Sequence, residues 1–254
     1  MNLKDKVVII TGASGVIGKA TSKLFKEEGA KLVLVDLNLD NLLEVANSIG
    51  LDEENSLLVS ANVTVESEVE NFINKAVEKF GRIDVLHNNA GIEGDVSNLV
   101  DTTVENMNNV LNINVVGVFL GLKHALRVML KQGSGSIINT ASDAGIGSAK
   151  GLGAYVASKH AVIGLTKTAA LECEDSGVRV NAICPSSINS RLMRSLEEGT
   201  GDPEAARKIY ESKIPMKRYG QPEEVGQVVL FLASDRSSFV TGAHYTVDGG
   251  RLAK

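Results

Sequence analysis

Short apolar runs rich in β-branched residues alternate along the chain with longer amphipathic stretches, and this alternation constrains the fold most strongly. The apolar runs are expected to be buried strands: Val7 to Ile10, Lys31 to Val35, Leu57 to Val59, Ile83 to Leu86, Ser136 to Asn139 and Val178 to Ile183. Helical patterns lie between them, over residues 17–28, 39–49, 66–80, 102–131 and 154–174. Thr64, ahead of several acids, is expected to cap the third helix. The alternation predicts βαβ units and an α/β fold of the Rossmann type, a doubly wound parallel sheet covered on both faces.

A single domain over residues 1–254 is expected, because no fixed-period repeat, low-complexity tract or Pro-rich linker interrupts the alternation. Residues 186–221 depart from it, since they mix serines, glycines, prolines and charges and are too many for an ordinary connection. Long connections in compact domains are usually lids or binding loops, so we expect residues 186–221 to form a substrate lid.

The composition argues against several classes of partner. A net charge of −5 disfavours non-specific nucleic-acid binding, which needs a basic surface. Cys173 and Cys184 have neither disulfide-framework nor metal-ligand spacing, and we expect both to be buried in a reducing compartment. No segment approaches the ~20 apolar residues of a membrane span, and the run Val7 to Ile10 is too short for a signal peptide. We therefore expect a cytoplasmic protein with no membrane, nucleic-acid or metal site.

A glycine-rich turn follows the first expected strand and leads directly into a helix. It reads Thr11-Gly12-Ala13-Ser14-Gly15-Val16-Ile17-Gly18. Glycines allow the backbone to turn tightly and approach a pyrophosphate, and the helix N-terminus offers unpaired N–H groups. Such a turn is weak evidence alone, but here it opens the first βαβ unit, which is the context of a dinucleotide site. We expect the cofactor to contact Gly12, Ser14, Gly15, Val16, Ile17 and Gly18.

Asp36 ends the second expected strand, roughly 20 residues past the glycines. An acid at this position can accept hydrogen bonds from both adenosine ribose hydroxyls and repels a 2′-phosphate. Leu37 follows it, where an arginine would favour the phosphate. The alternative is a plain turn residue at a strand end. The preceding glycine turn favours the ribose role, so NAD is expected rather than NADP.

Further motifs occur in the order seen in short-chain dehydrogenases/reductases. They are Asn88-Asn89-Ala90-Gly91, Asn114, Ser142, Tyr155-Val-Ala-Ser-Lys159, Pro185 and Val247-Asp248-Gly249-Gly250, together with the glycine turn. A tyrosine and lysine at this spacing are usually a solvated pair on a helix face. With all motifs in sequence, however, the chain resembles the short single-domain branch of that family over nearly its whole length.

The resemblance implies a catalytic set of Asn114, Ser142, Tyr155 and Lys159, with Ser142 and Tyr155 contacting the substrate. Tyr155 is then the general acid/base, one helical turn from Lys159. A tyrosine with a pKa of ~10 is a poor base at neutral pH, and lowering the pKa by about three units needs ~4 kcal/mol. An ammonium about 4 Å away supplies roughly that much at an effective dielectric near ~20, so we expect Lys159 to lower the pKa of Tyr155.

Two catalytic positions have simpler alternatives. Ser142, just past the fifth expected strand, is implied to bond the reacting oxygen, and the alternative is a turn cap. Asn114 is implied to hold a water that relays protons to Lys159, and the alternative is a solvent-facing polar residue.

The resemblance also implies cofactor contacts outside the glycine turn. They are Asp36, Leu37, Asn62, Val63, Asn89, Ala90, Gly91, Tyr155, Lys159, Pro185 and Ile188. Three positions depart from the family pattern: Val16 stands where the middle glycine is usual, Asn62 where an aspartate is common, and Ser186 where a glycine follows Pro185. Asn62 can still accept a hydrogen bond from adenine through its amide oxygen.

The implied reaction is reversible hydride transfer between NAD(H) and a secondary alcohol or ketone. The expected substrate pocket draws on Glu93-Gly94, Asp143-Ala144, Ile146 to Leu152 and the lid, with Met193, Leu196 and Ile209 as apolar lining. This composition favours a medium or large, mostly apolar substrate, although Glu93 and Arg191 or Arg194 could recognise polar groups.

Other functions remain open. A 3-oxoacyl-(acyl-carrier-protein) reductase is hard to exclude, but such enzymes commonly use NADPH and a basic surface, and Asp36 and the negative charge point away from both. Enoyl reductases of the family usually separate the tyrosine and lysine further. A non-catalytic NAD-binding redox sensor would have no need of the four catalytic residues. By resemblance alone, a homotetramer is expected.

Overall fold

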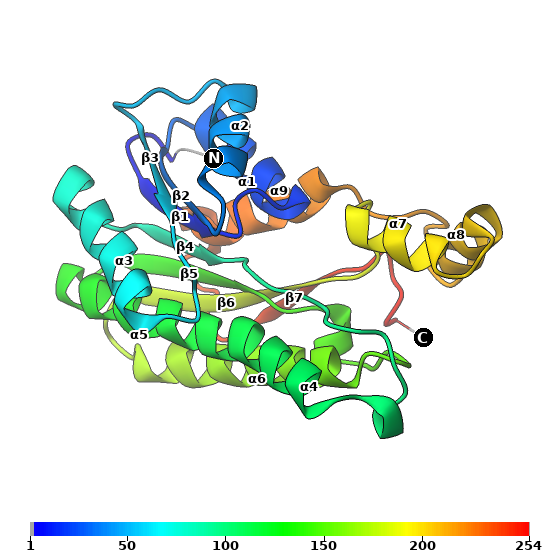
Figure 1. Ribbon diagram of the computed structural model, residues 1–254. Coiled ribbons are helices and arrows are strands. Elements are labelled where there is room, and N and C mark those ends of the chain that lie inside the picture. The colour runs from blue at the N-terminus through cyan, green and yellow to red at the C-terminus, as the bar shows by residue number, and fades with distance from the viewer. Residues whose placement is uncertain (1–2, 254) are drawn as a thin grey trace.

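The protein is built on a seven-stranded sheet (Figure 1). The computed structural model describes residues 3–253, apart from the side chains at positions 191 and 192. The strands are β1 (Val7–Thr11), β2 (Lys31–Asp36), β3 (Ser56–Ser60), β4 (Val85–Asn88), β5 (Gly135–Thr140), β6 (Val178–Pro185) and β7 (His244–Val247). Their order is β3-β2-β1-β4-β5-β6-β7, and each neighbouring pair is parallel. The chain winds outward from β1 in both directions, which is the predicted doubly wound topology.

Helices cover both faces of the sheet (Figure 1). One face carries α1 (Val16–Glu27), α2 (Leu39–Ile49) and α9 (Pro222–Ala233), and the other carries α3 (Glu66–Phe80), α4 (Val104–Leu111), α5 (Gly117–Gln132) and α6 (Gly153–Glu172). Short 3-10 turns lie at Leu99–Asp101, Asp143–Gly145 and Asp235–Ser237.

Each strand contributes side chains to two separate apolar cores. In β1, Val7 and Ile9 belong to the core under α3, α5 and α6, whereas Val8 and Ile10 belong to the core under α1, α2 and α9. Successive side chains of a strand point to opposite faces, so a strand covered on both faces must be apolar at every position. This requirement explains the continuous apolar runs in the sequence.

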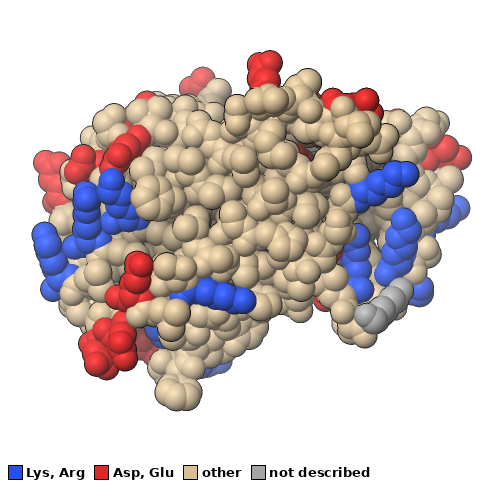
Figure 2. All heavy atoms as spheres, turned by 90° about the horizontal axis from the view of Figure 1, so that it is seen from below, with Lys and Arg blue, Asp and Glu red and all other residues tan. Residues whose placement is uncertain are grey.

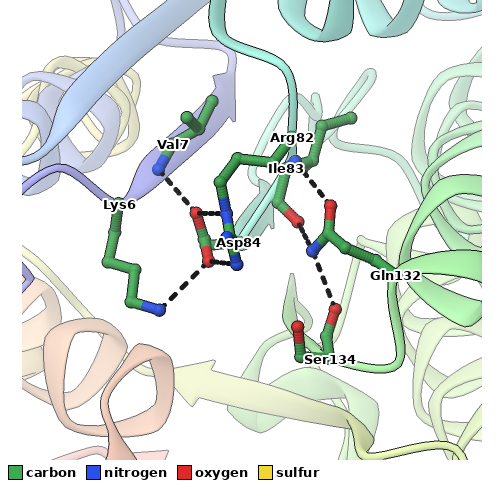
Figure 3. Close-up of polar contacts among 7 residues, drawn as sticks. All are labelled: Lys6, Val7, Arg82, Ile83, Asp84, Gln132 and Ser134. Atoms are coloured by element: carbon green, nitrogen blue, oxygen red, sulfur yellow. Dashed lines mark hydrogen bonds and ion pairs between the residues drawn. The ribbon is translucent and has the colours of Figure 1, made fainter.

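The fourth strand begins at Val85, so the expected start at Ile83 is wrong. The Ile83 N–H donates to the Gln132 Oε1 at 3.1 Å, and the Ile83 carbonyl accepts from the Gln132 Nε2 at 2.9 Å (Figure 3). The same Nε2 donates to the Ser134 carbonyl at 3.1 Å. The backbone of Ile83 is thus bonded to a side chain from the end of α5 rather than to a strand.

Asp84 joins the amino ends of β1 and β4 (Figure 3). Its carboxylate accepts from the Val7 N–H at 2.9 Å and pairs with Arg82 at 2.7 Å and Lys6 at 3.2 Å. This network lies at the sheet edge opposite the glycine turn, so it stabilises the fold without entering the site.

A π-helical segment, Asn112–Val116, interrupts the helix expected over 102–131 and separates α4 from α5.

The expectation that no segment could span a membrane is also corrected, because Val104–Gln132 is 29 residues long and apolar enough by length and composition. Half of its most apolar window is buried inside the protein, where α5 packs against α3, β4 and β5. The buried side chains of α5, which include Leu122, Ala125 and Met129, belong to the core on this face of the sheet.

Thr64 does not cap α3, contrary to expectation. The α3 helix follows Val65 without a side-chain cap bond. The Thr64 N–H and hydroxyl instead donate to the Asn62 Oδ1, at 3.0 and 2.8 Å. Asn62 thus forms a local turn through its amide oxygen, which satisfies the backbone two residues ahead of the helix.

Residues 186–221 form a helical projection beside the sheet (Figure 1). It contains α7 (Arg191–Glu198) and α8 (Pro203–Ser212), which the sequence patterns do not predict. Met193, Ile214 and Tyr219 form a small core of their own, against which Leu196 and Tyr210 pack. The buried Tyr219 hydroxyl donates to the Glu197 Oε1 at 2.7 Å. The projection is therefore held by its own packing rather than being an irregular loop.

Candidate active site

A cavity of about 430 Å³ lies among the turns that follow β1, β2, β3 and β4. Open α/β sheets bind ligands at such carboxyl ends, where the strand order reverses. The lining residues are Gly12, Ser14, Gly15, Asp36, Leu37, Ala61, Asn62, Val63, Thr64, Asn89, Ala90, Gly91, Ile92, Asn109, Asn112 and Ile113.

The glycine turn fits closely against the turn after β4. Gly12 has a φ of +63°, and a Cβ there would lie 2.8 Å from the Ala90 Cα. The Asn89 Nδ2 donates to the carbonyls of Thr11 and Gly12, both at 3.1 Å. The backbone shape of this cavity wall therefore depends on glycine at position 12.

Val16 does not crowd this cavity. Gly15 is the N-cap of α1, and Val16 is the first helical residue, with 38% of its surface exposed. Val16 is not part of the cavity lining, and neither are Ile17 and Gly18. A Cβ at Gly18 would collide with the Gly12 carbonyl oxygen, so Gly18 permits the close packing of the turn on its helix.

Asp36 holds its carboxylate at the cavity wall. The Ser14 N–H donates to the Oδ2 at 3.0 Å, the Ser14 hydroxyl bonds the same oxygen, and the Leu37 N–H donates to the Oδ1 at 2.8 Å. These bonds fix a negative charge beside the glycine turn. In contrast, both hydrogen bonds to the Asn62 amide oxygen come from Thr64, so this oxygen is already engaged.

Tyr155 and Lys159 lie one turn apart on α6, next to the end of β5. The buried Lys159 ammonium donates to the Thr140 carbonyl at 2.8 Å and lies 5.4 Å from the centre of the Tyr155 ring. Burial lowers the pKa of Lys159 to about 8, although the carboxylate of Glu93 opposes this shift.

Within the protein, the pKa of Tyr155 is raised rather than lowered, which corrects the expectation from sequence. Burial is the main cause, and the charges of Glu93 and Asp143 act in the same direction, whereas a hydrogen bond with Ser142 acts against them. The expectation was wrong because it counted the attraction of Lys159 without the desolvation of the phenolate.

Ser142 lies just past β5 and caps the 3-10 turn Asp143–Gly145. Its hydroxyl oxygen accepts from the Ala144 N–H at 3.2 Å, and the hydroxyl can donate to the Asp143 Oδ1 at 3.1 Å or to the Pro185 carbonyl at 3.4 Å. Ser142 is thus a turn cap, as the alternative interpretation expected, and it also forms a hydrogen bond with Tyr155.

Asn114 is fully buried within the π-helical segment, so the solvent-facing alternative is wrong. Its side chain donates to the Ile92 carbonyl at 2.7 Å and the Ser158 hydroxyl at 3.0 Å, and accepts from the Ile92 N–H at 2.8 Å. Asn114 thereby connects Ile92, in the turn after β4, to Ser158, which lies between Tyr155 and Lys159 in the sequence of α6.

A second cavity, of about 580 Å³, contains the Ser142 and Tyr155 side chains. Its apolar lining includes Val96, Leu152, Met193, Leu196 and Tyr210, and its charged lining comprises Glu93, Asp143, Lys150, Lys213 and Arg251. It adjoins the first cavity, because Ile92 lines one and Glu93 the other.

Comparison with known proteins assigns the family. A family model described as enoyl-(acyl carrier protein) reductase matches residues 12–251. The 3-oxoacyl-(acyl-carrier-protein) reductase FabG of Thermotoga maritima is 44% identical, over 98% of this chain and 99% of the relative. The chain belongs to the short-chain dehydrogenase/reductase family. Its members are oxidoreductases, and this protein is one of them.

Other members of the family are similar in sequence and structure. Levodione reductase of Leifsonia aquatica is 40% identical over 98% of this chain and 95% of the relative, and a levodione reductase crystal structure superposes with a TM-score of 0.93, covering 98% of each chain. An NAD+-bound xylitol dehydrogenase structure, 36% identical, has a TM-score of 0.93 and covers 98% of this chain and 100% of its own.

The structure of this short-chain dehydrogenase/reductase brings most of the predicted site residues together. Several predicted cofactor contacts do not line the first cavity: Val16, Ile17, Gly18, Tyr155, Lys159, Pro185 and Ile188. Of these, Tyr155 lines the second cavity. Pro185 lies nearer the reaction site, where its carbonyl is 3.4 Å from the Ser142 hydroxyl. Of the expected substrate contacts named outside the lid, Ile146, Gly147 and Gly151 do not line the second cavity. Arg194 and Ile209 of the lid do not line it either, and the side chain of Arg191 lies outside the described residues.

Several features of the site have no signal in the sequence. Lys159 is held by the Thr140 carbonyl, which any residue type could provide. Arg251 pairs with Asp143 at 2.8 Å, although the two are 108 positions apart. Among the described residues, no group of three His, Cys, Asp or Glu side chains could hold a metal ion. Cys173 and Cys184 are both buried, and this was predicted.

Proposed function

We propose that this oxidoreductase transfers hydride reversibly between NAD(H) and a secondary alcohol or its ketone. The observation that carries the proposal is the Tyr155–Ser142 pair in one cavity, directly beside a cavity walled by the glycine turn and Asp36. The relatives act on alcohols or ketones according to their names, which supports the same reaction type here.

The first cavity fits a dinucleotide. Gly12 and Gly15 line this cavity without side chains, so a pyrophosphate could lie against backbone there. The carboxylate of Asp36 is positioned for ribose hydroxyls and repels a 2′-phosphate, which favours NAD over NADP. The NAD+-bound xylitol dehydrogenase supports this cofactor.

Tyr155 is the proposed proton acceptor in alcohol oxidation. Because burial raises its pKa, Tyr155 needs positive charge nearby to lose its proton at neutral pH. Lys159, with a pKa of about 8, is mostly protonated at pH 7 and supplies one such charge. When bound, oxidised NAD supplies the hydride acceptor and a second positive charge.

Ser142 and Asn114 orient the reacting groups. The Ser142 hydroxyl is proposed to bond the substrate oxygen beside Tyr155. The side chain of Asn114 is already bonded to Ile92 and Ser158, so a proton relay to Lys159 would use main-chain groups of the π-helical segment, where regular hydrogen bonding is interrupted.

The substrate class follows from the second cavity. Its size and its apolar residues from both the sheet edge and α7 suit a medium or large alcohol or ketone of mostly apolar character. Glu93 is partly buried in its wall, and burial raises the pKa of this carboxyl. A hydroxyl on the substrate could hydrogen-bond Glu93, so we favour substrates with a second oxygen, such as diols and hydroxyketones.

Residues 186–221 are proposed to act as the substrate lid. The segment contributes four side chains to the lining of the second cavity, which also contains Tyr155: Met193, Leu196, Tyr210 and Lys213. Because the segment has its own small core, we expect it to move as a unit.

A homotetramer is proposed for the assembly. Figure 2 shows that the face formed by α4, α5 and α6 carries few charges over its centre. Apolar surface is exposed at Val104 on α4, Val116 at the end of the π-helical segment and Phe119 on α5. Light scattering coupled to size exclusion would test the assembly.

The buried, unpaired Cys173 and Cys184 suit a reducing compartment, and we propose a cytoplasmic location.

Reduction of a 3-oxoacyl thioester is a second candidate, favoured by the 44% identity to the Thermotoga maritima reductase. A panel of substrates separates the two candidates, scored by the change in NADH absorbance. The panel contains cyclohexanol, 1,2-cyclohexanediol, 2,3-butanediol, their ketones and acetoacetyl-coenzyme A. The proposal expects the highest kcat/KM with a diol or hydroxyketone, and a marked preference for acetoacetyl-coenzyme A would contradict it.

Glu93→Gln tests the substrate class within the same panel. We expect the ratio of kcat/KM for 1,2-cyclohexanediol to kcat/KM for cyclohexanol to fall about tenfold in the variant, since one charged hydrogen bond contributes about 1.5–3 kcal/mol. The effect of the Glu93 charge on Tyr155 is common to both alcohols and cancels in this ratio. Glu105→Gln is a matched control, because Glu105 is exposed on α4. Equal losses with both alcohols would argue against recognition of a second hydroxyl.

A further inference from the structure

A chain of hydrogen bonds connects Arg251 to the reaction site. The Arg251 Nη1 donates to the Asp143 Oδ2 at 2.8 Å, and the Ser142 hydroxyl donates to the Asp143 Oδ1 at 3.1 Å. Asp143 and Ser142 are both buried, at 7% and 6% exposed. A buried carboxylate held by one guanidinium and one hydroxyl partner is strongly ordered. The orientation of the Ser142 hydroxyl therefore depends on how Asp143 is held.

The turn Asp248–Leu252 delivers Arg251 to this position. The Asp248 carboxylate accepts from the Gly250 N–H at 2.9 Å and the Leu252 N–H at 2.8 Å. Gly249 and Gly250 have positive φ values of +59° and +86°, a conformation that favours glycine. The chain is thereby folded back over the 3-10 turn that holds Asp143.

Arg251 also reaches the start of the lid segment. Its Nη1 lies 3.4 Å from the Ser186 hydroxyl, and Ser186 is the residue where the family pattern has glycine. One guanidinium therefore connects the Ser142 segment with the first residue of 186–221.

The Ser142 hydroxyl has one proton and several acceptors. Here the hydroxyl lies within donating distance of the Asp143 Oδ1, at 3.1 Å, and of the Pro185 carbonyl, at 3.4 Å, whereas catalysis requires its proton at the substrate oxygen or at the Tyr155 phenolate. An unpaired carboxylate would compete strongly for this proton, and pairing with Arg251 weakens that competition.

We propose that Asp143 and Arg251 are positioning residues, which set the direction of the Ser142 hydroxyl and the net charge beside Tyr155. This inference rests on the proposed function, because the proton in question is the one that Tyr155 exchanges with the alcohol.

The titratable and charged groups around Tyr155 come from five elements. Glu93 follows β4, Asp143 follows β5, Lys159 lies on α6, Cys184 lies on β6, and Arg251 stands behind Asp143. The charges of Glu93 and Asp143 both act to raise the pKa of Tyr155, whereas the buried Cys184 thiol stays neutral because burial raises its own pKa. Removing the charge of Asp143 must therefore lower this pKa, and removing Arg251 must raise it by leaving Asp143 unpaired.

Four variants test the proposal: Asp143→Asn, Arg251→Met, the double variant and Arg251→Lys. The pH profile of kcat/KM is measured for oxidation of 1,2-cyclohexanediol with NAD+, and the acid-side midpoint reports Tyr155. We expect Asp143→Asn to lower the midpoint by about one pH unit and Arg251→Met to raise it by about one, which is a tenfold change in proton affinity each. The double variant should follow Asp143→Asn, and Arg251→Lys should restore the wild-type midpoint.

A second readout does not depend on turnover. Phenolate absorbance is titrated with NAD+ present, and each variant is compared with the same variant carrying Tyr155→Phe. The same order of midpoints is expected. If no alcohol is turned over but this order holds, the proposed function fails and the positioning role stands.

Unmoved midpoints, or shifts of both single variants in one direction, would overturn the proposal and leave Arg251 as a purely structural contact. Should Arg251→Met fail to fold, Asp143→Asn decides alone, because it keeps the shape of the side chain and removes only the charge.

Discussion

The Lys159 nitrogen lies over the Tyr155 ring, 5.4 Å from its centre, and is fixed there by its hydrogen bond to the Thr140 carbonyl. Lys159 is 4% exposed, and its pKa of about 8 means that its charge is lost in mildly alkaline solution. The charge that favours the phenolate is thus buried and positioned, but it is available only at neutral and acidic pH.

Replacement of either residue should remove turnover while leaving the fold intact. We expect Tyr155→Phe and Lys159→Met each to reduce kcat by roughly 10²–10⁴-fold, the usual contribution of a positioned acid/base. His160→Ala is the control, because His160 is exposed on the same helix. Steady-state rates measure the loss, and NADH fluorescence tests whether Tyr155→Phe still binds the cofactor. Retention of most of the wild-type rate by Tyr155→Phe would refute the general-base role.

Substitution by alanine should change the stability of the protein in opposite directions at Gly18, in α1, and at Gly164, in α6. Gly18→Ala places a Cβ against the Gly12 carbonyl and 2.8 Å from the Ala13 Cα, so overpacking should destabilise the protein by about 1–3 kcal/mol. It should also weaken NADH binding, since the turn would shift. Gly164 is exposed on α6 with nothing within 4 Å of the added Cβ, so Gly164→Ala should stabilise by up to about 1 kcal/mol. Urea unfolding and NADH fluorescence measure both effects, and equal behaviour of the two variants would contradict the packing argument.

His87 should make the protein sensitive to acid. It is fully buried on β4, and burial lowers its pKa from 6.5 to about 3. Between these values the unfolded chain binds a proton that the folded protein does not, so stability is lost as the pH falls, at ~1.4 kcal/mol per pH unit.

His87→Gln keeps a polar side chain for the Thr140 hydroxyl, which lies 2.9 Å from the His87 Nε2, but cannot titrate. Urea unfolding at pH 7 and pH 4.5 should show a loss about 2–3 kcal/mol smaller in this variant than in the wild type. His160→Gln serves as the control because His160 is exposed. An identical loss in His87→Gln and the wild type would show that His87 is not the acid-sensitive group.

The strands that were predictable are those buried on both faces. The continuous runs at Val7 to Ile10 and Lys31 to Val35 follow directly from a sheet covered by helices. β7, in contrast, is a short edge strand whose residues alternate between exposed and partly buried, so it has no apolar run to reveal it. The start of β4 depends on the Gln132 side chain, which reaches Ile83 across 49 positions.

For the site too, the sequence predicts features that depend on local residue patterns but not those that depend on contacts between distant segments. The glycine turn, Asp36 and the Tyr155–Lys159 spacing are local patterns, and the structure brings them to one sheet edge. The raised pKa of Tyr155 and the Asp143–Arg251 pair depend on burial and on contacts between distant segments. No residue spacing in the sequence indicates either feature.

Cofactor preference is the remaining prediction, and it depends on the charge of Asp36. Asp36→Asn keeps an oxygen for the hydrogen bonds from Ser14 while removing the charge, and Leu37→Arg adds a cation at an exposed position beside the cavity. A unit charge about 5 Å from a phosphate contributes about 1–3 kcal/mol at effective dielectrics between bulk water and ~20. We therefore expect Asp36→Asn with Leu37→Arg to raise the affinity for NADP relative to NAD by roughly 10–100-fold.

The measurement is a fluorescence titration of wild type and variants with NADH and NADPH. Asp40→Asn is the matched control, because Asp40 is an exposed acid in the first turn of α2 and does not line the cavity. It should leave the ratio of the two affinities unchanged, which separates a local charge at the ribose position from a general change in net charge. Tighter binding of NADPH than NADH by the wild type would contradict the role of Asp36, since an unscreened carboxylate at this wall cannot favour an added phosphate.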